Sequence, residues 1–175
     1  GLAGSFAQWV GEMIPDVKQK ILLVTYEDKQ DEAITRLSRV GYDNTLGFLK
    51  GGFSSWRNSK NEMETIHRIS ATTMKKELNA EKPLVIDVRK KSEYDSEHVI
   101  GAINVPLNQI NQNLAQFPKD RTFIIQCAGG YRSKIAASIL KQRGWNDFVD
   151  VSGGFEAISK TDIAKTEYVC PSTLL

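Results

Sequence analysis

The sequence predicts an α/β protein with a parallel β-sheet and helices on both faces of the sheet, plus an incomplete second copy of the same fold. The main observation is an internal repeat, because residues 20–44 align without a gap onto residues 123–147. After one inserted residue, the stretch LKGGFSSW aligns with VSGGFEAI. Each copy reads as a buried strand, an amphipathic helix that ends at a glycine, a short strand and a Gly-Gly-Phe turn into another helix. This alternation is typical of parallel sheets.

The second copy is preceded by a longer run of elements. Residues 66–70 (IHRIS) read as a short strand, and Ser70 is a suitable N-cap for a helix over residues 71–79. The apolar run PLVIDV, residues 83–88, predicts a buried strand. A short helix or turn, KSEYDSEH, and a loop, GAINVPL, are expected to follow it.

The first copy lacks this lead-in, since the alignment places residue 1 opposite Asn104. We therefore expect a partial, degenerate copy over residues 1–57, a polar linker over residues 58–65 and a complete domain over residues 66–175. About a third of a domain would then be missing, which predicts that this sequence is part of a longer protein.

A partial sheet should expose a sheet edge and apolar surface. Four aromatic side chains of the first copy are candidates to cover that surface: Phe6, Trp9, Phe53 and Trp56. We expect residues 1–57 to pack against the complete domain or against a second copy of the chain, as in a homodimer.

Composition restricts the classes of function. The net charge of +2 is too small to indicate a nucleic-acid surface, and no apolar run reaches the roughly 18 residues of a membrane span. The start of the sequence lacks the basic residues of a signal peptide.

Two cysteines, Cys127 and Cys170, are too few for a disulfide framework and favour a reducing, cytoplasmic location. These cysteines and the two histidines show no paired spacing, so no metal or other cofactor is expected in this chain.

The segment IIQCAGGYRSKIAAS, residues 124–138, carries the candidate chemistry. Cys127 stands where a strand ends, and Gly129 and Gly130 allow the turn to bring backbone N–H groups together before a helix begins. The N–H groups, the helix dipole and Arg132 create a positive potential that favours the thiolate. Such a thiolate attacks an electrophilic sulfur or phosphorus atom. The alternative, a buried structural cysteine, does not require two glycines and an arginine after it.

The length of the loop separates the two chemistries. The spacing from Cys127 to Arg132 is C-x4-R, whereas a phosphate-binding cysteine loop generally needs C-x5-R to encircle the oxyanion. The tighter loop suits a persulfide sulfur, so the expected reaction is transfer of sulfane sulfur to a thiol or to cyanide. A cysteine phosphatase or arsenate reductase is the less favoured enzyme alternative.

The same residues resemble a known family. VIDVRKKSEYDSEHVIGAINVPL and IIQCAGGYRSKIAASILKQRGWNDFVDVSGGFEAI are closely similar to the rhodanese domain, over nearly all of residues 66–160. The resemblance implies a sulfurtransferase with a five-stranded parallel sheet, in which Cys127 forms the persulfide and Arg132 attracts anionic donors. Thiosulfate, glutathione persulfide and polysulfides are all compatible donors. It identifies the substrate-binding residues as those of the loop: Ala128, Gly129, Gly130, Tyr131, Arg132 and Ser133.

Other residues of these motifs receive supporting or neutral roles. Asp87 and Arg89 fit an ion pair that braces the loop, in preference to direct catalysis. His98 is expected to be a satisfied histidine at a turn and not a general base. Tyr131 either shapes substrate access or is plainly exposed. Cys170 is expected to be a tail cysteine without a role, the alternative being a resolving thiol.

The first copy departs from the rhodanese pattern at the site itself. Val24 occupies the cysteine position and Lys29 the arginine position, and TYEDKQ contains no glycine. We therefore expect this copy to be a non-catalytic rhodanese-like scaffold.

A degenerate copy followed by an active one resembles the C-terminal part of bacterial fusion proteins that begin with a metallo-β-lactamase-fold domain. GSFAQWVGEMIPDVKQKILLV and the tail KTEYVCPSTLL are similar to the equivalent segments of that group. The resemblance implies persulfide metabolism and a metal centre held only by the missing N-terminal domain. A third interpretation is a domain that has the same fold but catalyses no reaction, namely a non-catalytic sulfur carrier or docking module.

Overall fold

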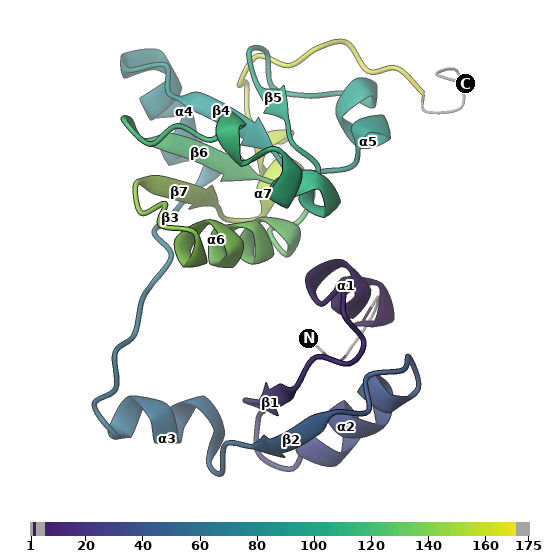
Figure 1. Cartoon of the computed structure of the whole chain (residues 1–175). Coiled ribbons are helices and arrows are strands. Elements are labelled where there is room, and N and C mark those ends of the chain that lie inside the picture. The colour runs from purple at the N-terminus through teal and green to yellow at the C-terminus, as the bar shows by residue number, and fades with distance from the viewer. Residues whose placement is uncertain (1, 3–5, 171–175) are drawn as a thin grey trace. The chain divides into compact units, whose positions relative to one another are not determined.

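Short apolar runs form a five-stranded parallel sheet in the C-terminal part of the chain, which confirms the predicted fold class (Figure 1). Its strands are β3 (Arg68–Ile69), β4 (Leu84–Asp87), β5 (Ile103–Asn104), β6 (Phe123–Gln126) and β7 (Phe148–Val151). They are ordered β3-β7-β6-β4-β5, so β6 is the central strand. All four residues of β6 are buried, as expected for a strand that is covered on both faces.

The computed structural model describes residue 2 and residues 6–170. It divides into two compact units, a first unit over residues 1–64 and a second unit over residues 65–175. Residues 61–67, which adopt neither helix nor strand, join them. The two terminal segments from which the sequence predicts a fusion protein include residues 4, 5 and 171–175, which lie outside the described residues.

Helices lie on both faces of the sheet in the second unit. They are α4 (Ala71–Ala80), α5 (Lys91–Ser96), α6 (Arg132–Gln142) and α7 (Gly154–Ile158), with two 3-10 helices, η1 (Leu107–Gln112) and η2 (Leu114–Gln116). Helix α4 begins as predicted, because the Ser70 hydroxyl accepts a hydrogen bond from the Thr73 N–H at 3.0 Å.

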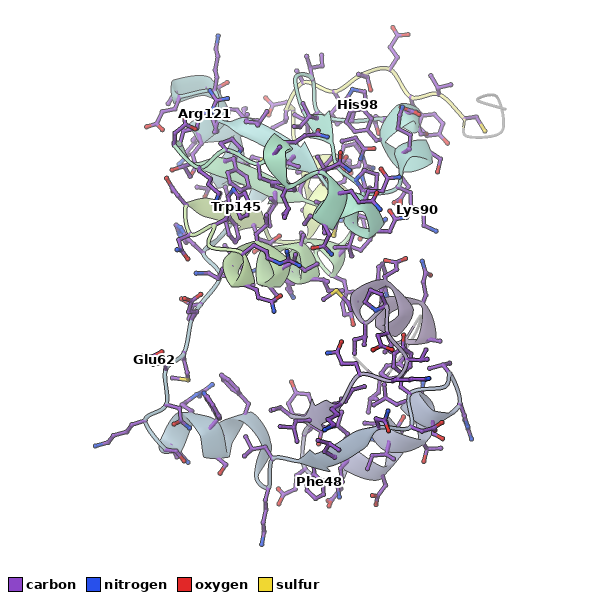
Figure 2. The ribbon with its side chains drawn as sticks, viewed as in Figure 1. Phe48, Glu62, Lys90, His98, Arg121 and Trp145 are labelled. Atoms are coloured by element: carbon purple, nitrogen blue, oxygen red, sulfur yellow. The ribbon has the colours of Figure 1, made fainter. Side chains whose placement is uncertain are left out.

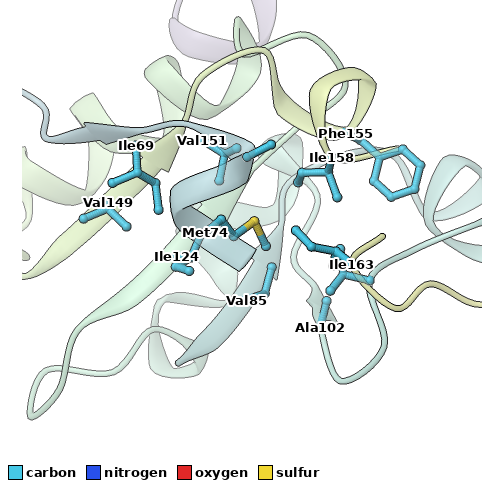
Figure 3. Packing of buried hydrophobic residues seen from close by; sticks show 12 residues of the cluster. Ile69, Met74, Val85, Ala102, Ile124, Val149, Val151, Phe155, Ile158 and Ile163 are labelled. Atoms are coloured by element: carbon cyan, nitrogen blue, oxygen red, sulfur yellow. The ribbon is translucent and has the colours of Figure 1, made fainter. Parts of the chain in front are cut away.

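The main hydrophobic core lies between the sheet and the layer formed by α4 and α7 (Figure 3). Met74 from α4 and Ile158 from α7 are completely buried there, together with Ile124 from the central strand. Phe123, the neighbour of Ile124, points to the opposite face because side chains alternate along a strand. It packs there against Phe117 and Phe148.

The first unit contains a smaller version of this arrangement. Its elements are α1 (Phe6–Met13), β1 (Ile21–Leu23), α2 (Gln30–Ser38), β2 (Thr45–Phe48) and α3 (Gly52–Asn58). Strands β1 and β2 pair in parallel. Three buried residues, Ile21, Leu37 and Tyr42, form its core, and Phe6 and Val10 of α1 pack against them.

The sequence repeat reappears as matching contacts. Trp145 is buried (Figure 2), and its Nε1–H donates to the carbonyl of Phe117 at 3.1 Å. Tyr42 aligns with Trp145 in the repeat, and its hydroxyl donates to the carbonyl of Ile14 at 2.5 Å. Ile14 and Phe117 are related by the same offset as the two aromatic residues, so the repeat extends into the segment before each strand.

The open sheet of the first unit exposes apolar side chains, as its partial sequence predicts. Leu22 and Leu46 are 75% and 62% exposed. Phe48, which Figure 2 labels on the first unit, is 48% exposed. Of the aromatic residues expected to cover this surface, Phe53 and Trp56 also remain exposed. Strand β1 is thus only partly buried, with Ile21 inside and Leu22 exposed, which corrects the prediction of a buried strand in the first copy.

One element of the second unit also differs from its prediction. GAINVPL is not wholly a loop, because Ile103 and Asn104 form β5 and pair with Ile86 and Asp87. Two residues at the edge of a sheet produce no alternating pattern that a sequence could reveal. This edge strand completes the five-stranded sheet.

Candidate active site

The site is built where β6 ends and α6 begins, at the carboxyl edge of the sheet. Cys127 directly follows β6 and is only 1% exposed. Its Sγ accepts a hydrogen bond from the Gly130 N–H at 3.2 Å and donates one to the Ser133 Oγ at 3.5 Å. The loop therefore curls back over the sulfur, which is the arrangement expected of a backbone nest at a helix N-terminus.

Two glycines allow this conformation. Gly130 has a φ of +85°, in the left-handed region that L side chains rarely adopt. Gly154, in the Gly-Gly-Phe turn, lies against the loop: a Cβ there would overlap the carbonyl oxygen of Cys127 and lie 2.6 Å from that of Ala128. The N–H of Phe155 donates to the Cys127 carbonyl at 2.6 Å. The turn thus fixes the start of the loop from behind.

Asp87 and Arg89 form the predicted ion pair. Both are buried, and Arg89 Nη2 lies 2.7 Å from Asp87 Oδ2 while Nε lies 2.9 Å from the same oxygen. Arg89 also donates to the carbonyl of Glu97 at 2.8 Å and stacks over the Phe155 ring at 4.0 Å. Since Phe155 holds the Cys127 carbonyl, the pair contacts the loop through one intermediate residue.

Arg132, the arginine of the loop, is bound by a carboxylate that the sequence analysis did not single out. Its two terminal nitrogens lie 2.5 and 2.8 Å from the two carboxylate oxygens of Glu93, which comes from α5. This hydrogen bond raises the pKa of Arg132, and the charge of Cys127 acts in the same direction. Burial raises the pKa of Glu93, but Arg132 outweighs it and holds that pKa below its ordinary value.

The remaining loop residues differ in their access to solvent. Gly129 is exposed and Tyr131 is 43% exposed, whereas Ala128 is half-buried and Ser133 is completely buried. Tyr131 thus lies at the outside of the loop. Ser133 lies on its inside, where its hydroxyl reaches the sulfur of Cys127.

Three further residues next to the loop escaped the sequence analysis: Glu93, Arg68 and Glu156. The carboxylate of Glu156 lies 3.4 Å from the position that a Cβ on Gly129 would occupy. Arg68 Nη2 lies 3.8 Å from the corresponding position on Gly130. These contacts join segments that are far apart in the chain, so the sequence does not reveal them. For Glu93 alone there was a local signal, because it is a carboxylate in the first turn of the short helix predicted from KSEYDSEH.

His98 and Cys170 lie outside the loop. His98 stacks on the ring of Tyr94, with ring centres 3.7 Å apart, and its Nδ1 lies 2.7 Å from the Tyr94 carbonyl. This confirms a satisfied histidine at a turn. Cys170 is exposed and follows Val169, whose N–H donates to the Ser96 carbonyl.

The first unit carries different groups at the aligned positions. Val24, at the cysteine position, is 57% exposed, and Lys29, at the arginine position, pairs with Glu32 at 3.0 Å. A hollow of about 1250 Å³, lined largely by apolar side chains, occupies this region of the first unit. A Cβ on Gly52 would overlap the carbonyl oxygen of Thr25, so the Gly-Gly-Phe turn keeps its contact without the cysteine.

The described part of the chain contains neither a metal-binding cluster nor a membrane-spanning helix. Within it, no group of three His, Cys, Asp or Glu side chains is placed to hold a metal ion. None of its helices combines the length and the apolar character needed to cross a membrane.

A parallel α/β domain with a thiol enclosed by a strand-to-helix loop defines a class of cysteine-centred domains. The family model of the rhodanese-like domain matches residues 70–161, more than half of the 175-residue chain. The chain belongs to that family. The match covers every strand of the second unit from β4 onward and the whole cysteine loop.

Relatives of known sequence agree with this assignment. The uncharacterized protein YqhL of Bacillus subtilis is 33% identical over 91 residues, which are 51% of this chain and 72% of YqhL. Thiosulfate sulfurtransferase PspE of Escherichia coli is 37% identical over 76 residues, 42% of this chain and 72% of PspE. Putative sulfur carrier protein YrkF of Bacillus subtilis is 28% identical over 106 residues, 60% of this chain. The chain spans 55% of YrkF and only 20% of the MoeZ proteins of Mycobacterium tuberculosis.

Solved structures share the fold. A rhodanese-like domain protein from Staphylococcus aureus has a TM-score of 0.53 and 30% identity, covering 59% of this chain and all of that one. A thiosulfate sulfurtransferase from Pseudomonas aeruginosa has a TM-score of 0.52 and 22% identity, covering 91% of this chain and 35% of that one. The second likeness concerns the fold alone.

Proposed function

We propose that the second unit is a sulfurtransferase that moves sulfane sulfur through a persulfide on Cys127. The observation that carries this proposal is the enclosure of the Cys127 sulfur by the Gly130 N–H and the Ser133 hydroxyl at the start of α6. The name of one relative, PspE, which is called a thiosulfate sulfurtransferase, supports it.

The proposed reaction consists of two nucleophilic displacements at sulfur. The Cys127 thiolate attacks the outer sulfur of a donor such as thiosulfate, an S–S bond forms to Cys127, and sulfite leaves with the electron pair of the broken bond. The outer sulfur of the persulfide is then attacked by a thiolate or by cyanide, and the Cys127 thiolate is released. The Gly130 N–H points at the sulfur and stabilises its negative charge in both steps.

A rate assay tests the proposal. Thiocyanate formation from thiosulfate and cyanide should disappear in a Cys127→Ser variant and persist in Cys170→Ser, which changes the exposed cysteine. Hydrolysis of an aryl phosphate by the same protein would favour the phosphatase instead. Inertness toward thiosulfate, a small-molecule persulfide and the aryl phosphate would favour a non-catalytic module.

The non-catalytic alternative has one observation in its favour. YrkF, which is 28% identical over 60% of this chain, bears the name of a putative sulfur carrier protein. A carrier would hold the persulfide and release it only to a partner protein. It would therefore accept sulfur from a donor but show no turnover with cyanide or small thiols.

A wider setting belongs to the same proposal. The partial first unit and the resemblance of both terminal segments to metallo-β-lactamase-fold fusion proteins support a partner domain that precedes this chain. That domain, and not this chain, would hold a metal centre, and the reaction would take place in a reducing, cytoplasmic environment. Sequencing the natural transcript upstream of Gly1 would test this setting.

A further inference from the structure

Three arginine side chains lie around the cysteine loop, and each forms an ion pair with a carboxylate. Arg132 lies within the loop, Arg68 lies beside Gly130, and Arg89 stacks on Phe155, whose N–H binds the carbonyl of Cys127. Each guanidinium is bound by a carboxylate at 3.0 Å or less: Arg132 by Glu93, Arg89 by Asp87 and Arg68 by Asp150.

The pair at Arg132 includes a residue of the cysteine loop itself. Glu93 binds Arg132 through both carboxylate oxygens, which is the strongest geometry for this type of pair. The Arg132 side chain is only 14% exposed. An arriving anion therefore meets a guanidinium whose charge is already balanced.

A fourth carboxylate adds to this balance. Glu156 is exposed, and its carboxylate lies 3.4 Å from the position of a Cβ on Gly129, an exposed residue of the loop. Three guanidinium groups and four carboxylates thus surround the loop. Because these opposite charges largely cancel, the second negative charge of a dianionic donor adds little attraction. Coulomb energy scales with the product of the donor's charge and the net charge that surrounds it.

We propose that Glu93 is a specificity-determining residue, which acts through Arg132 and makes the loop favour singly charged sulfane-sulfur donors over dianionic thiosulfate. The inference rests on the proposed sulfurtransferase function and names the donor class of that site. It changes the expectation that Arg132 attracts thiosulfate, because the positive charge of Arg132 is already paired with the Glu93 carboxylate.

Two donors differ in charge while reacting in the same way. Thiosulfate, a dianion, transfers its outer sulfur to the Cys127 thiolate and releases sulfite. Methanethiosulfonate, a monoanion, transfers its outer sulfur to the same thiolate and releases methanesulfinate. In each reaction one S–S bond breaks, one forms, and the leaving group departs with the electron pair.

The experiment measures kcat/KM for both donors, with cyanide as acceptor, on the full chain and on Glu93→Gln. Freeing Arg132 should raise the value for thiosulfate about tenfold and that for methanethiosulfonate only about threefold, because attraction scales with donor charge. The gain with thiosulfate should shrink at high ionic strength, which a purely structural effect would not do. Glu81→Gln is the charge control, since Glu81 is exposed and precedes β4 at the opposite edge of the sheet.

Glu156→Gln is the second variant, because it removes a negative charge beside the loop without breaking an ion pair of Arg132. It should shift the ratio of the two donors toward thiosulfate even if Glu93→Gln fails to fold. An unchanged ratio in the folded variants would overturn the inference while both donors still load sulfur. If neither donor loads sulfur on the unaltered chain, the proposed function itself fails.

Discussion

Cys127 is held in place by its own loop and by the Gly-Gly-Phe turn. Its sulfur bonds to Gly130 and Ser133 in its own loop, while its carbonyl oxygen is held by Phe155 of the Gly-Gly-Phe turn. Burial of the sulfur means that a donor must enter a preformed cradle. At this scale the site depends on backbone geometry more than on any single side chain.

Gly154 should tolerate no side chain. In Gly154→Ala the new Cβ would overlap the carbonyl of Cys127, and we expect a loss of more than about 2 kcal/mol in unfolding free energy together with loss of sulfur transfer. Gly144→Ala is the matched control, because Gly144 has a φ of +88° but nothing within 4 Å of its Cβ position. It should cost about 1 kcal/mol and leave activity intact. Equal costs in urea unfolding would contradict the close contact.

Asp87 should be needed for stability. Asp87→Asn would leave Arg89 buried with a weakened partner, which we expect to cost about 3–5 kcal/mol by urea denaturation. Asp162→Asn removes the exposed pair with Lys75 and should leave stability nearly unchanged. A small cost for Asp87→Asn would argue against a bracing role for the pair.

Helices α5 and α6 are joined by the Glu93–Arg132 pair across 39 positions of sequence. Strand β6 and the Gly-Gly-Phe turn were predictable because the internal repeat marks them twice. Strand β5 was not, since two residues show no period. The Glu93–Arg132 pair was not predictable either, because no local sequence pattern indicates which distant segment a helix will contact.

This connection predicts an acid dependence of stability. The pKa of Glu93 is lowered by Arg132 in the folded state, so its ionised form contributes stability that is complete above the unfolded pKa of about 4.3. That contribution is lost as the pH falls through the lower folded pKa. The difference in unfolding free energy between the unaltered chain and Glu93→Gln should be constant from about pH 7 to 5.5 and shrink below about pH 4. A constant difference down to acid pH would contradict the ion pair.

The two units of the chain differ in completeness. The second unit has a five-stranded sheet and its own core, whereas the first has two paired strands and a core of three buried residues. Two strands alone are marginally stable. The described residues of the candidate site all belong to the second unit, and we predict that sulfur transfer needs no residue of the first.

Separating the units should therefore give unequal products. A fragment of residues 65–175 should unfold cooperatively in urea and keep the sulfur-transfer activity of the full chain. A fragment of residues 1–64 should show little cooperative unfolding by circular dichroism. If residues 65–175 failed to fold alone, the first unit would be part of the stable core of the protein.

Intact mass after incubation with a sulfane-sulfur donor shows whether Cys127 carries sulfur. With thiosulfate or methanethiosulfonate, the unaltered chain should gain the mass of one sulfur atom and lose it again on addition of cyanide. Cys127→Ser should gain none, and Cys170→Ser should behave like the unaltered chain. A mass that stays unchanged with both donors, or a gain that survives in Cys127→Ser, would contradict a persulfide on Cys127.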